Sequence, residues 1–307
     1  MKRLFQIHIP CFISIIFCGM IFSLCIKGSD TTGQPWEKKI KENWVKEHLL
    51  GDNPQLPFSF IFDGKASSDL LKTWQKKTET NKVDINRTQY ILNWTDNKTG
   101  LEVRCIAIEY SDFSVFDWTV YFKNTGTSNT PILKDIQGLD ARFEKDTNGK
   151  FILHGNKGDW CVAESYEPYQ LTLDPNMNKR FAPVGGRPTN GPEGWPYYNL
   201  QMPGGGLIIA VGWPGQWATS FVRDEKDGLR IVAGQEQTNL YLKPGERIRT
   251  PLITLQFWQG ADTVRAQNLW RRYFLAHIIP TINDKIPPPM SQMPASNLVP
   301  RVRARHE

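Results

Sequence analysis

Cysteine and histidine are scarce in this sequence, and neither occurs in a metal-binding pattern. Of the five cysteines, three fall within residues 1–27, so only Cys105 and Cys161 remain in the body of the chain. The five histidines are scattered, and no Cys-x-x-Cys or His-x-x-x-His spacing occurs. We therefore expect no metal site, and no cofactor is indicated.

Nucleotide-binding and nucleophile motifs are also absent. The sequence contains no Gly-x-Ser-x-Gly, Walker or Rossmann pattern, and Gly204–Gly206 is a turn before a strand because no helix follows it. Without residues 1–27 and 301–307, 31 basic and 30 acidic residues remain. The nearly neutral body has no basic stripe, so no nucleic acid partner is expected.

The acidic residues form no recognisable catalytic signature. Glycoside cleavage uses two carboxylates held roughly 5 to 10 Å apart by rigid elements. Among 31 Asp and Glu residues, no such pair can be identified from spacing. We therefore assign no catalytic residue.

Aromatic residues are plentiful, with 11 Trp, 16 Phe and 9 Tyr, and they favour strands. Between Val115 and Phe122 every second residue is apolar, and the residues between them are mixed in polarity. One face of the segment is therefore apolar and the other mixed, which predicts a half-buried strand. Turn signals separate similar runs at 58–62, 89–94, 101–110, 136–143, 151–154, 207–212, 219–223, 229–233, 239–242 and 248–258. Almost no helix intervenes, so residues 54–260 are predicted to form an all-β, antiparallel sandwich.

One helix is predicted on each side of the sandwich. Within residues 28–53, Trp36, Ile40 and Trp44 lie at helical spacing on one face, and Gly51 ends the helix. Residues 261–290 begin with a helix capped by Asp262 and continue into a stiff proline-rich connector. Residues 291–307 have no periodicity and are expected to be a disordered or aberrant tail.

Residues 1–27 have the pattern of an export signal. A cationic start precedes an apolar run that ends at Lys27. We expect a periplasmic or extracellular protein, with a retained membrane anchor as the alternative. In such a compartment Cys105 and Cys161 could form a disulfide, although two separate thiols fit the sequence equally well.

The stretch that carries the most chemistry is Gly155–Cys161, together with Gly185–Gly191 and Trp195–Leu200. It has few β-branched residues and many Gly, Pro and polar residues, so we predict a long functional loop that emerges from a sheet. Asp159 beside Trp160 could bind sugar hydroxyls under a stacked ring. Alternatively, Asp159 is a turn residue that bonds its own backbone.

Several linked motifs resemble the N-terminal region of bacterial α-galactosidases of glycoside hydrolase family 36. They are Leu153–Trp160, Arg180–Asn190, Pro196–Leu200, Gly212–Trp217, Leu255–Trp258 and Ala266–Arg272. The similarity covers roughly residues 54–290. It implies a β-supersandwich joined by a linker helix to a barrel that supplies both catalytic aspartates of a retaining mechanism.

The resemblance also implies a role for this chain. It would be the sandwich and linker helix without the barrel, as in a truncated or frameshifted gene product, and inactive alone. Asp159, Trp160, Arg187 and Asn190 would line the rim of a substrate pocket for galactose-containing oligosaccharides. The partners would be the catalytic barrel and other copies of the full-length enzyme. A free-standing, secreted carbohydrate-binding module is the alternative.

Overall fold

The computed structural model describes residues 33–145, 149–283 and 285–287. The chain divides into two compact units, Met1–Trp270 and Arg271–Glu307. The expected export signal at 1–27 and the tail at 291–307 lie outside the described residues, so both stay predictions. Within the described part of the chain, no helix is long and apolar enough to cross a membrane.

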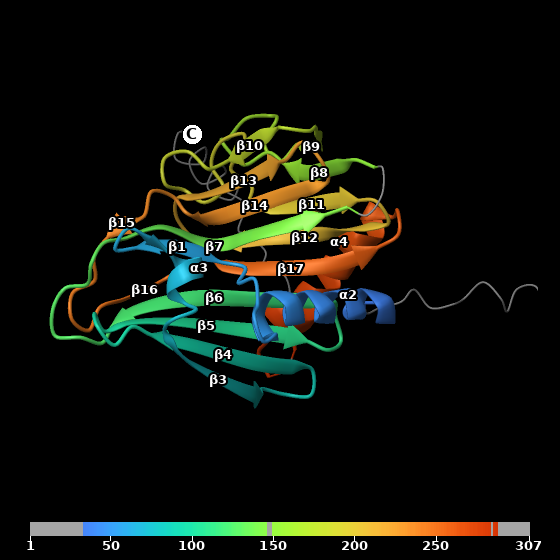
Figure 1. The fold of residues 1–307 in the computed structure, drawn as a ribbon. Coiled ribbons are helices and arrows are strands. Elements are labelled where there is room, and N and C mark those ends of the chain that lie inside the picture. Colours follow the sequence, from blue (N-terminus) through green and yellow to red (C-terminus); the bar gives the residue numbers. More distant parts are fainter. Residues whose placement is uncertain (1–32, 146–148, 284, 288–307) are drawn as a thin grey trace, which may run out of the picture. The chain divides into compact units, whose positions relative to one another are not determined.

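The first unit contains two sheets in which all strand pairs are antiparallel (Figure 1). The smaller sheet has the order β10–β13–β14–β7–β1–β2, and β15 also pairs with β7. Its strands are β1 (Ser59–Phe62), β2 (Lys65–Ala66), β7 (Leu133–Glu144), β10 (Asn178–Phe181), β13 (Trp217–Arg223), β14 (Gly228–Gln235) and β15 (Asn239–Leu240). A single helical turn, α3 (Ser67–Leu70), follows β2.

The larger sheet has the order β3–β4–β5–β6–β17–β12–β11–β8–β9, and β16 also pairs with β6. Its strands are β3 (Gln75–Lys82), β4 (Arg87–Thr95), β5 (Leu101–Tyr110), β6 (Val115–Asn124), β8 (Phe151–Asn156), β9 (Pro168–Leu173), β11 (Tyr197–Met202), β12 (Gly205–Gly212), β16 (Arg247–Arg249) and β17 (Leu252–Gln259).

One hydrophobic core joins the two sheets, and it confirms the predicted all-β antiparallel sandwich. Phe60 from the smaller sheet packs edge to face against Phe122 from the larger sheet, with ring centroids 5.1 Å apart. The same cluster contains buried side chains from β4, β7 and β14. From Val115 to Val120 both faces of β6 are buried, so β6 is a central strand and not the half-buried strand that the sequence indicated.

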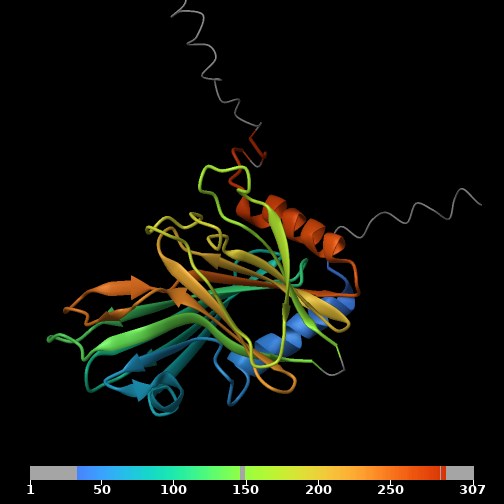
Figure 2. The same cartoon turned by 90° about the horizontal axis from the view of Figure 1, so that it is seen from above.

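The N-terminal helix forms where it was expected, but with a different buried face. α2 (Pro35–Val45) continues as a π-helical turn (Lys46–Leu50) and ends at Gly51. It contacts β6 and β17 (Figure 2). Trp44 is buried, whereas Trp36 and Ile40, predicted on the same face, are 53% and 39% exposed. The buried face instead comprises Glu37, Lys41, Trp44, Val45, His48 and Leu49.

Polar contacts explain this rotation of α2. Lys41 Nζ donates to the carbonyl oxygen of Tyr110 at 2.6 Å and pairs with Glu109 at 3.1 Å. Glu37 accepts two hydrogen bonds from Arg265, at 2.7 and 3.0 Å. These contacts turn Glu37 and Lys41 toward the sheet, and Trp36 and Ile40 consequently face outward.

The C-terminal helix begins as predicted. The side chain of Asp262 accepts from Arg265 N at 2.9 Å, which caps α4 (Thr263–Tyr273). Within the first unit, Ala266 and Leu269 are the buried face of this helix. In the second unit the chain continues as a π-helical turn (Phe274–Ile278).

The long loop expected around Trp160 is shorter than predicted, because strands run through it. Gly155 and Asn156 end β8, β9 and β10 lie within the region, and β11 takes up Tyr197–Leu200. Two loops remain, residues 157–167 between β8 and β9 and residues 182–196 between β10 and β11. We call them the paired loops.

Candidate functional site

The paired loops are joined to each other through their backbones. Asp159 and Asn190 form a parallel bridge, in which Asp159 N donates to Thr189 O at 2.7 Å and Gly191 N donates to Asp159 O at 3.3 Å. A Cβ on Gly158 would lie 2.4 Å from the same Thr189 oxygen. Only glycine permits this approach. The structure thus brings together two segments that the sequence placed in one functional region.

The Asp159 carboxylate is engaged within its own loop. It accepts from Cys161 N at 3.0 Å, and contacts with Ser165 and Tyr166 join that bond in lowering the pKa of the carboxyl. Asp159 is therefore a turn residue whose side chain bonds the backbone of its own loop, which is the second of the two interpretations given from the sequence.

Asn190 also has a local structural contact. Its side-chain Nδ2 donates to Val184 O at 2.9 Å, and Asn190 O accepts from Val184 N at 3.0 Å. Both contacts close the glycine-rich segment that contains Arg187.

The segment before β13 fixes the same loop from outside. Gln216 Nε2 donates to Pro183 O at 2.8 Å, and Gln216 Oε1 accepts from Gly186 N at 3.0 Å. Trp217 Nε1 donates to Pro188 O at 2.8 Å. The Gly212–Trp217 motif therefore holds the second paired loop in shape.

Trp160 and Arg187 remain available among the predicted site residues. Trp160 is half-buried and Arg187 is exposed. The guanidinium of Arg187 makes no hydrogen bond or ion pair with any residue that the structure describes. Neither side chain would have to break a hydrogen bond, ion pair or ring contact with a described residue to contact a ligand.

A row of aromatic rings extends from the paired loops to α4. Trp195 lies 5.4 Å from Tyr166 and 5.8 Å from Tyr197, and Tyr197 lies 6.2 Å from Trp270. We call Tyr166, Trp195, Tyr197 and Trp270 the aromatic row. Tyr166 is 50% exposed and the other three are half-buried. Sequence reasoning missed Tyr166, because nothing near it in the chain marks it.

Three carboxylates near the paired loops pair with lysine or arginine, whereas the Glu164 side chain makes no hydrogen bond or ion pair with any residue that the structure describes. Lys157 pairs with Glu167, Lys179 with Glu193, and Arg180 with Glu236. Over the described ranges, no cluster of three or more His, Cys, Asp or Glu side chains could hold a metal ion. The surface is suited to binding a neutral ligand and offers no unengaged carboxylate pair for acid–base chemistry.

The two body cysteines are separate thiols in this structure. Cys105 is buried on β5 and Cys161 is exposed in the first paired loop. Burial raises the pKa of the Cys105 thiol. Of the two alternatives that the sequence left open, the structure contains the one without a disulfide.

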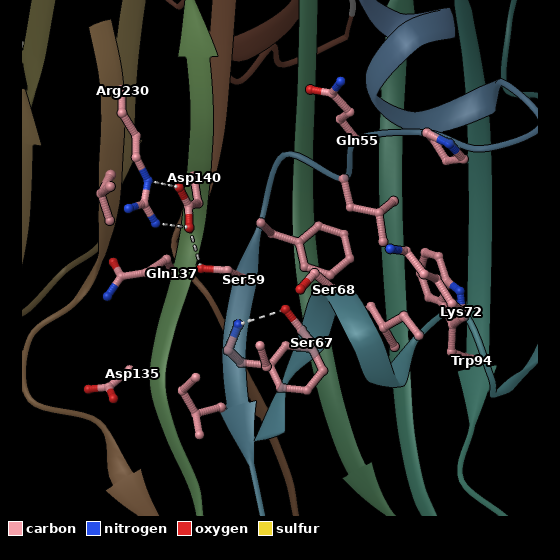
Figure 3. Close-up of a pocket in the computed structure, with 18 of the residues that line it drawn as sticks. Gln55, Ser59, Ser67, Ser68, Lys72, Trp94, Asp135, Gln137, Asp140 and Arg230 are labelled. Carbon is pink, nitrogen blue, oxygen red and sulfur yellow. Dashed lines mark hydrogen bonds and ion pairs between the residues drawn. The ribbon is translucent and has the colours of Figure 1, made fainter. Parts of the chain in front are cut away.

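A groove of about 1130 Å³ lies beside β1. On one side Figure 3 shows Ser59, Gln137, Asp140 and Arg230, and on the other Ser67, Ser68, Lys72 and Trp94. We call it the β1 groove. It shares no lining residue with the paired loops. Sequence reasoning missed it because its walls come from segments far apart in the chain.

Comparisons with known proteins find similar folds among solved structures, whereas no family profile and no curated protein matches the chain. An α-galactosidase from Lactobacillus brevis matches with a TM-score of 0.53 and 16% identity, over 74% of this chain and 32% of the enzyme. The family 36 α-galactosidase AgaA from Geobacillus stearothermophilus, in complex with stachyose, matches with a TM-score of 0.50 and 15% identity, over 71% of this chain and 32% of the enzyme.

The likeness is one of fold. This chain spans about a third of the length of the enzymes that it matches. The resemblance to family 36 α-galactosidases expected from the motifs is confirmed at that level. The motifs also pack together: Trp258 Nε1 donates to Asn199 Oδ1 at 2.9 Å, and Gln256 Nε2 donates to Ala266 O at 3.0 Å.

Proposed function

We propose that this chain is the β-sandwich portion of an α-galactosidase-like glycoside hydrolase. The observation that carries the proposal is the fold match, which covers most of this chain and about a third of each enzyme. In this proposal catalysis takes place on a barrel domain outside the matched region. The complete enzyme hydrolyses terminal α-D-galactosides with retention of configuration, and the expected export signal directs it out of the cytoplasm.

In this proposal the paired loops shape the rim of the galactoside pocket. Trp160 provides a flat indole face for the C–H surface of a sugar ring, and Arg187 provides hydrogen-bond donors for its hydroxyls. Asp159 and Asn190 act indirectly, because their side chains hold the loop backbones that carry Trp160 and Arg187. They are positioning residues.

The shortage of free carboxylates supports a non-catalytic role for this surface, because Glu164 is the one Asp or Glu of the two loops whose side chain has no hydrogen bond or ion pair among the described residues. A retaining glycosidase needs two carboxyl groups roughly 5 to 5.5 Å apart, one of them free to attack the sugar. Asp159 bonds its own loop, while Glu167, Glu193 and Glu236 are paired with cations. None of these four groups is available as a nucleophile without breaking a contact.

The alternative, a free-standing carbohydrate-binding module, is favoured by one observation, the partly exposed aromatic row. Solvent-exposed aromatic rings are typical of surfaces that bind a partner or ligand. Such a module would bind galactosides with this chain alone.

A binding and activity assay separates the two functions. We expect the chain alone neither to cleave 4-nitrophenyl α-D-galactoside nor to show saturable fluorescence quenching by D-galactose. When the chain is supplied with its catalytic barrel, Trp160→Ala should raise KM about fivefold with little change in kcat, because one stacking contact contributes roughly 1 kcal/mol. Trp36→Ala, which removes an exposed ring on α2, is the matched control.

Two results would contradict the proposal. Hydrolysis by the chain alone would place the catalytic residues within the sandwich. Saturable D-galactose binding by the chain alone, lost in Trp160→Ala and kept in Trp36→Ala, would establish the binding module instead.

A further inference from the structure

The β1 groove is built on a fixed polar cluster. Asp140 accepts two hydrogen bonds from Arg230, at 2.6 and 2.8 Å, and one from Ser59 Oγ at 2.6 Å. The Asp140 carboxylate raises the pKa of the Arg230 guanidinium. Arginine has five N–H donors, and these bonds use two of them. Figure 3 shows the two hydrogen bonds that hold Arg230 against Asp140. The remaining N–H donors of Arg230 can bind a ligand.

Further polar side chains line the groove without internal partners. The side chains of Gln137, Asn178 and Ser220 make no hydrogen bond within residues 33–145, 149–283 and 285–287. The same is true of Ser68 and Gln55. Amides and hydroxyls both donate and accept, which matches the hydroxyl groups of a sugar, each of which also does both.

The apolar part of the lining is rigid and aromatic. Trp94 packs edge to face on Phe58 at 5.9 Å, and Trp74 packs edge to face on Phe62 at 6.0 Å. Trp74 is half-buried, so part of its ring is open to a ligand. Rigid rings beside hydrogen-bonding groups suit a ligand with both C–H and O–H surfaces.

The charge of its lining residues and the volume of the β1 groove indicate which class of ligand it can bind. The lining contains three cations (Lys72, Lys76, Arg230) and three carboxylates (Asp52, Asp135, Asp140), so it selects neither a polyanion nor a polycation. Its volume of about 1130 Å³ is slightly larger than the roughly 300 to 1,000 Å³ typical of small-ligand sites. A single sugar would leave much of this space empty, whereas an oligosaccharide would fill it.

From these features we propose that the β1 groove is a binding site for a neutral oligosaccharide. Arg230 and the amides of Gln137 and Asn178 bond the sugar hydroxyls, and the ring of Trp74 contacts a sugar face. The site is separate from the paired loops and does not depend on the function proposed for them.

Titration calorimetry on the full chain tests this site. The probes are stachyose and maltotetraose, two neutral tetrasaccharides, and tetragalacturonate, an anionic one of similar size. We expect at least one neutral probe to bind saturably and more tightly than tetragalacturonate.

Substitutions of groove residues test whether the oligosaccharide binds in the β1 groove. The double variant Gln137→Ala/Asn178→Ala should weaken binding about tenfold, because two hydrogen bonds at roughly 0.5 to 1.5 kcal/mol each are lost. Ser220→Trp places a large side chain in the groove and should abolish binding. Asn97→Ala/Gln267→Ala, a pair of the same residue types outside the groove, should leave it unchanged, and circular dichroism confirms the fold of each variant.

Two outcomes would overturn this site. One is the absence of saturable binding for both neutral probes. The other is binding that Trp160→Ala removes and that Ser220→Trp and the double groove variant leave intact, which would place the ligand on the paired loops. Neither measurement uses hydrolysis, so this proposal can fail while the proposed function stands.

Discussion

Lys41 shows how one side chain can decide the orientation of a helix. It is 1% exposed, and its ammonium group is satisfied by the Tyr110 carbonyl and the Glu109 carboxylate. Desolvation lowers the pKa of Lys41, and the Glu109 charge offsets part of that shift. Removing one partner of such a buried pair leaves the other without compensation.

We therefore expect Lys41→Ala to reduce the free energy of unfolding by roughly 3 kcal/mol. Lys39→Ala is the control, because Lys39 lies on the same helix with its side chain 69% exposed, and it should change stability by less than about 0.5 kcal/mol. Urea unfolding of both variants measures the difference. Equal stabilities would show that Lys41 does not anchor α2.

Asp224 makes the stability of the β13–β14 turn dependent on pH. Its carboxylate accepts from Gly228 N at 3.0 Å and Lys226 N at 2.8 Å and pairs with Arg142 at 2.6 Å. The Gly228 bond is the largest cause that lowers its pKa to about 2, followed by the Arg142 pair. A carboxyl with a lowered folded-state pKa stabilises the fold above its unfolded pKa, and that contribution is lost on acidification.

Thermal unfolding between pH 6 and pH 2 tests this turn. The wild-type contribution should be complete above about pH 4 and disappear as the pH falls toward 2. Asp224→Asn should therefore have a lower Tm at pH 6 and a smaller further decrease on acidification. Asp69→Asn, at an exposed aspartate of α3, is the control. Parallel pH profiles for Asp224→Asn and wild type would be inconsistent with this role.

Individual residue roles could be predicted only in part. The sequence allowed two interpretations of Asp159, because a turn aspartate and a ligand-binding aspartate have the same sequence pattern. Only the structure shows that Cys161 N donates to its carboxylate. The Asp262 cap was predictable because its contact is local. Lys41 was not, since its partners are about 70 residues away in the chain.

At the scale of elements, strands were predictable where apolar and polar residues alternate. The sequence predicted β5 and β6, which lie in the core. It did not predict β3, because all eight residues of β3 are exposed and so have no alternation of apolar and polar side chains. β3 is an edge strand, and its charged side chains discourage pairing with another chain. β11 was missed because its Gly- and Pro-rich surroundings are typical of loops.

The link between α2 and α4 is a buried ion pair between Glu37 and Arg265. Glu37 is fully buried, and it also accepts from Gln259 N at 2.9 Å and from Gln34 N at 2.7 Å. A bidentate pair of this kind fixes both distance and orientation. The two helices, separated by the whole sandwich in sequence, are thereby held together.

We expect Glu37→Gln to destabilise the fold by roughly 3 kcal/mol, since the substitution removes the buried carboxylate charge that pairs with Arg265. Arg265→Met alone should have a comparable effect. The double variant should cost less than the sum of the two, and a double-mutant cycle by urea unfolding measures that coupling. Strict additivity would mean that the two helices are not coupled through this pair.

At the scale of the whole molecule, the sandwich and the pairing of the Trp160 and Arg187 loops were predictable, but the packing of the other motifs and the β1 groove were not. The motifs around Trp160, Trp217 and Trp258 each carry a local pattern, and the fold brings them together through the contacts of Gln216, Trp217 and Trp258. The groove has no such pattern. Ser59, Asp140 and Arg230 become neighbours only when β1, β7 and β14 pair.

We propose that this sandwich works with a catalytic barrel. The nucleotide sequence of the locus downstream of the Pro287 codon, translated in all frames, tests this proposal. We expect it to encode a segment with the pattern of alternating strands and helices and with two catalytic aspartates, in this or another frame or in an adjacent gene. A locus without any such segment would contradict it, and would leave the free-standing carbohydrate-binding module as the function of this fold.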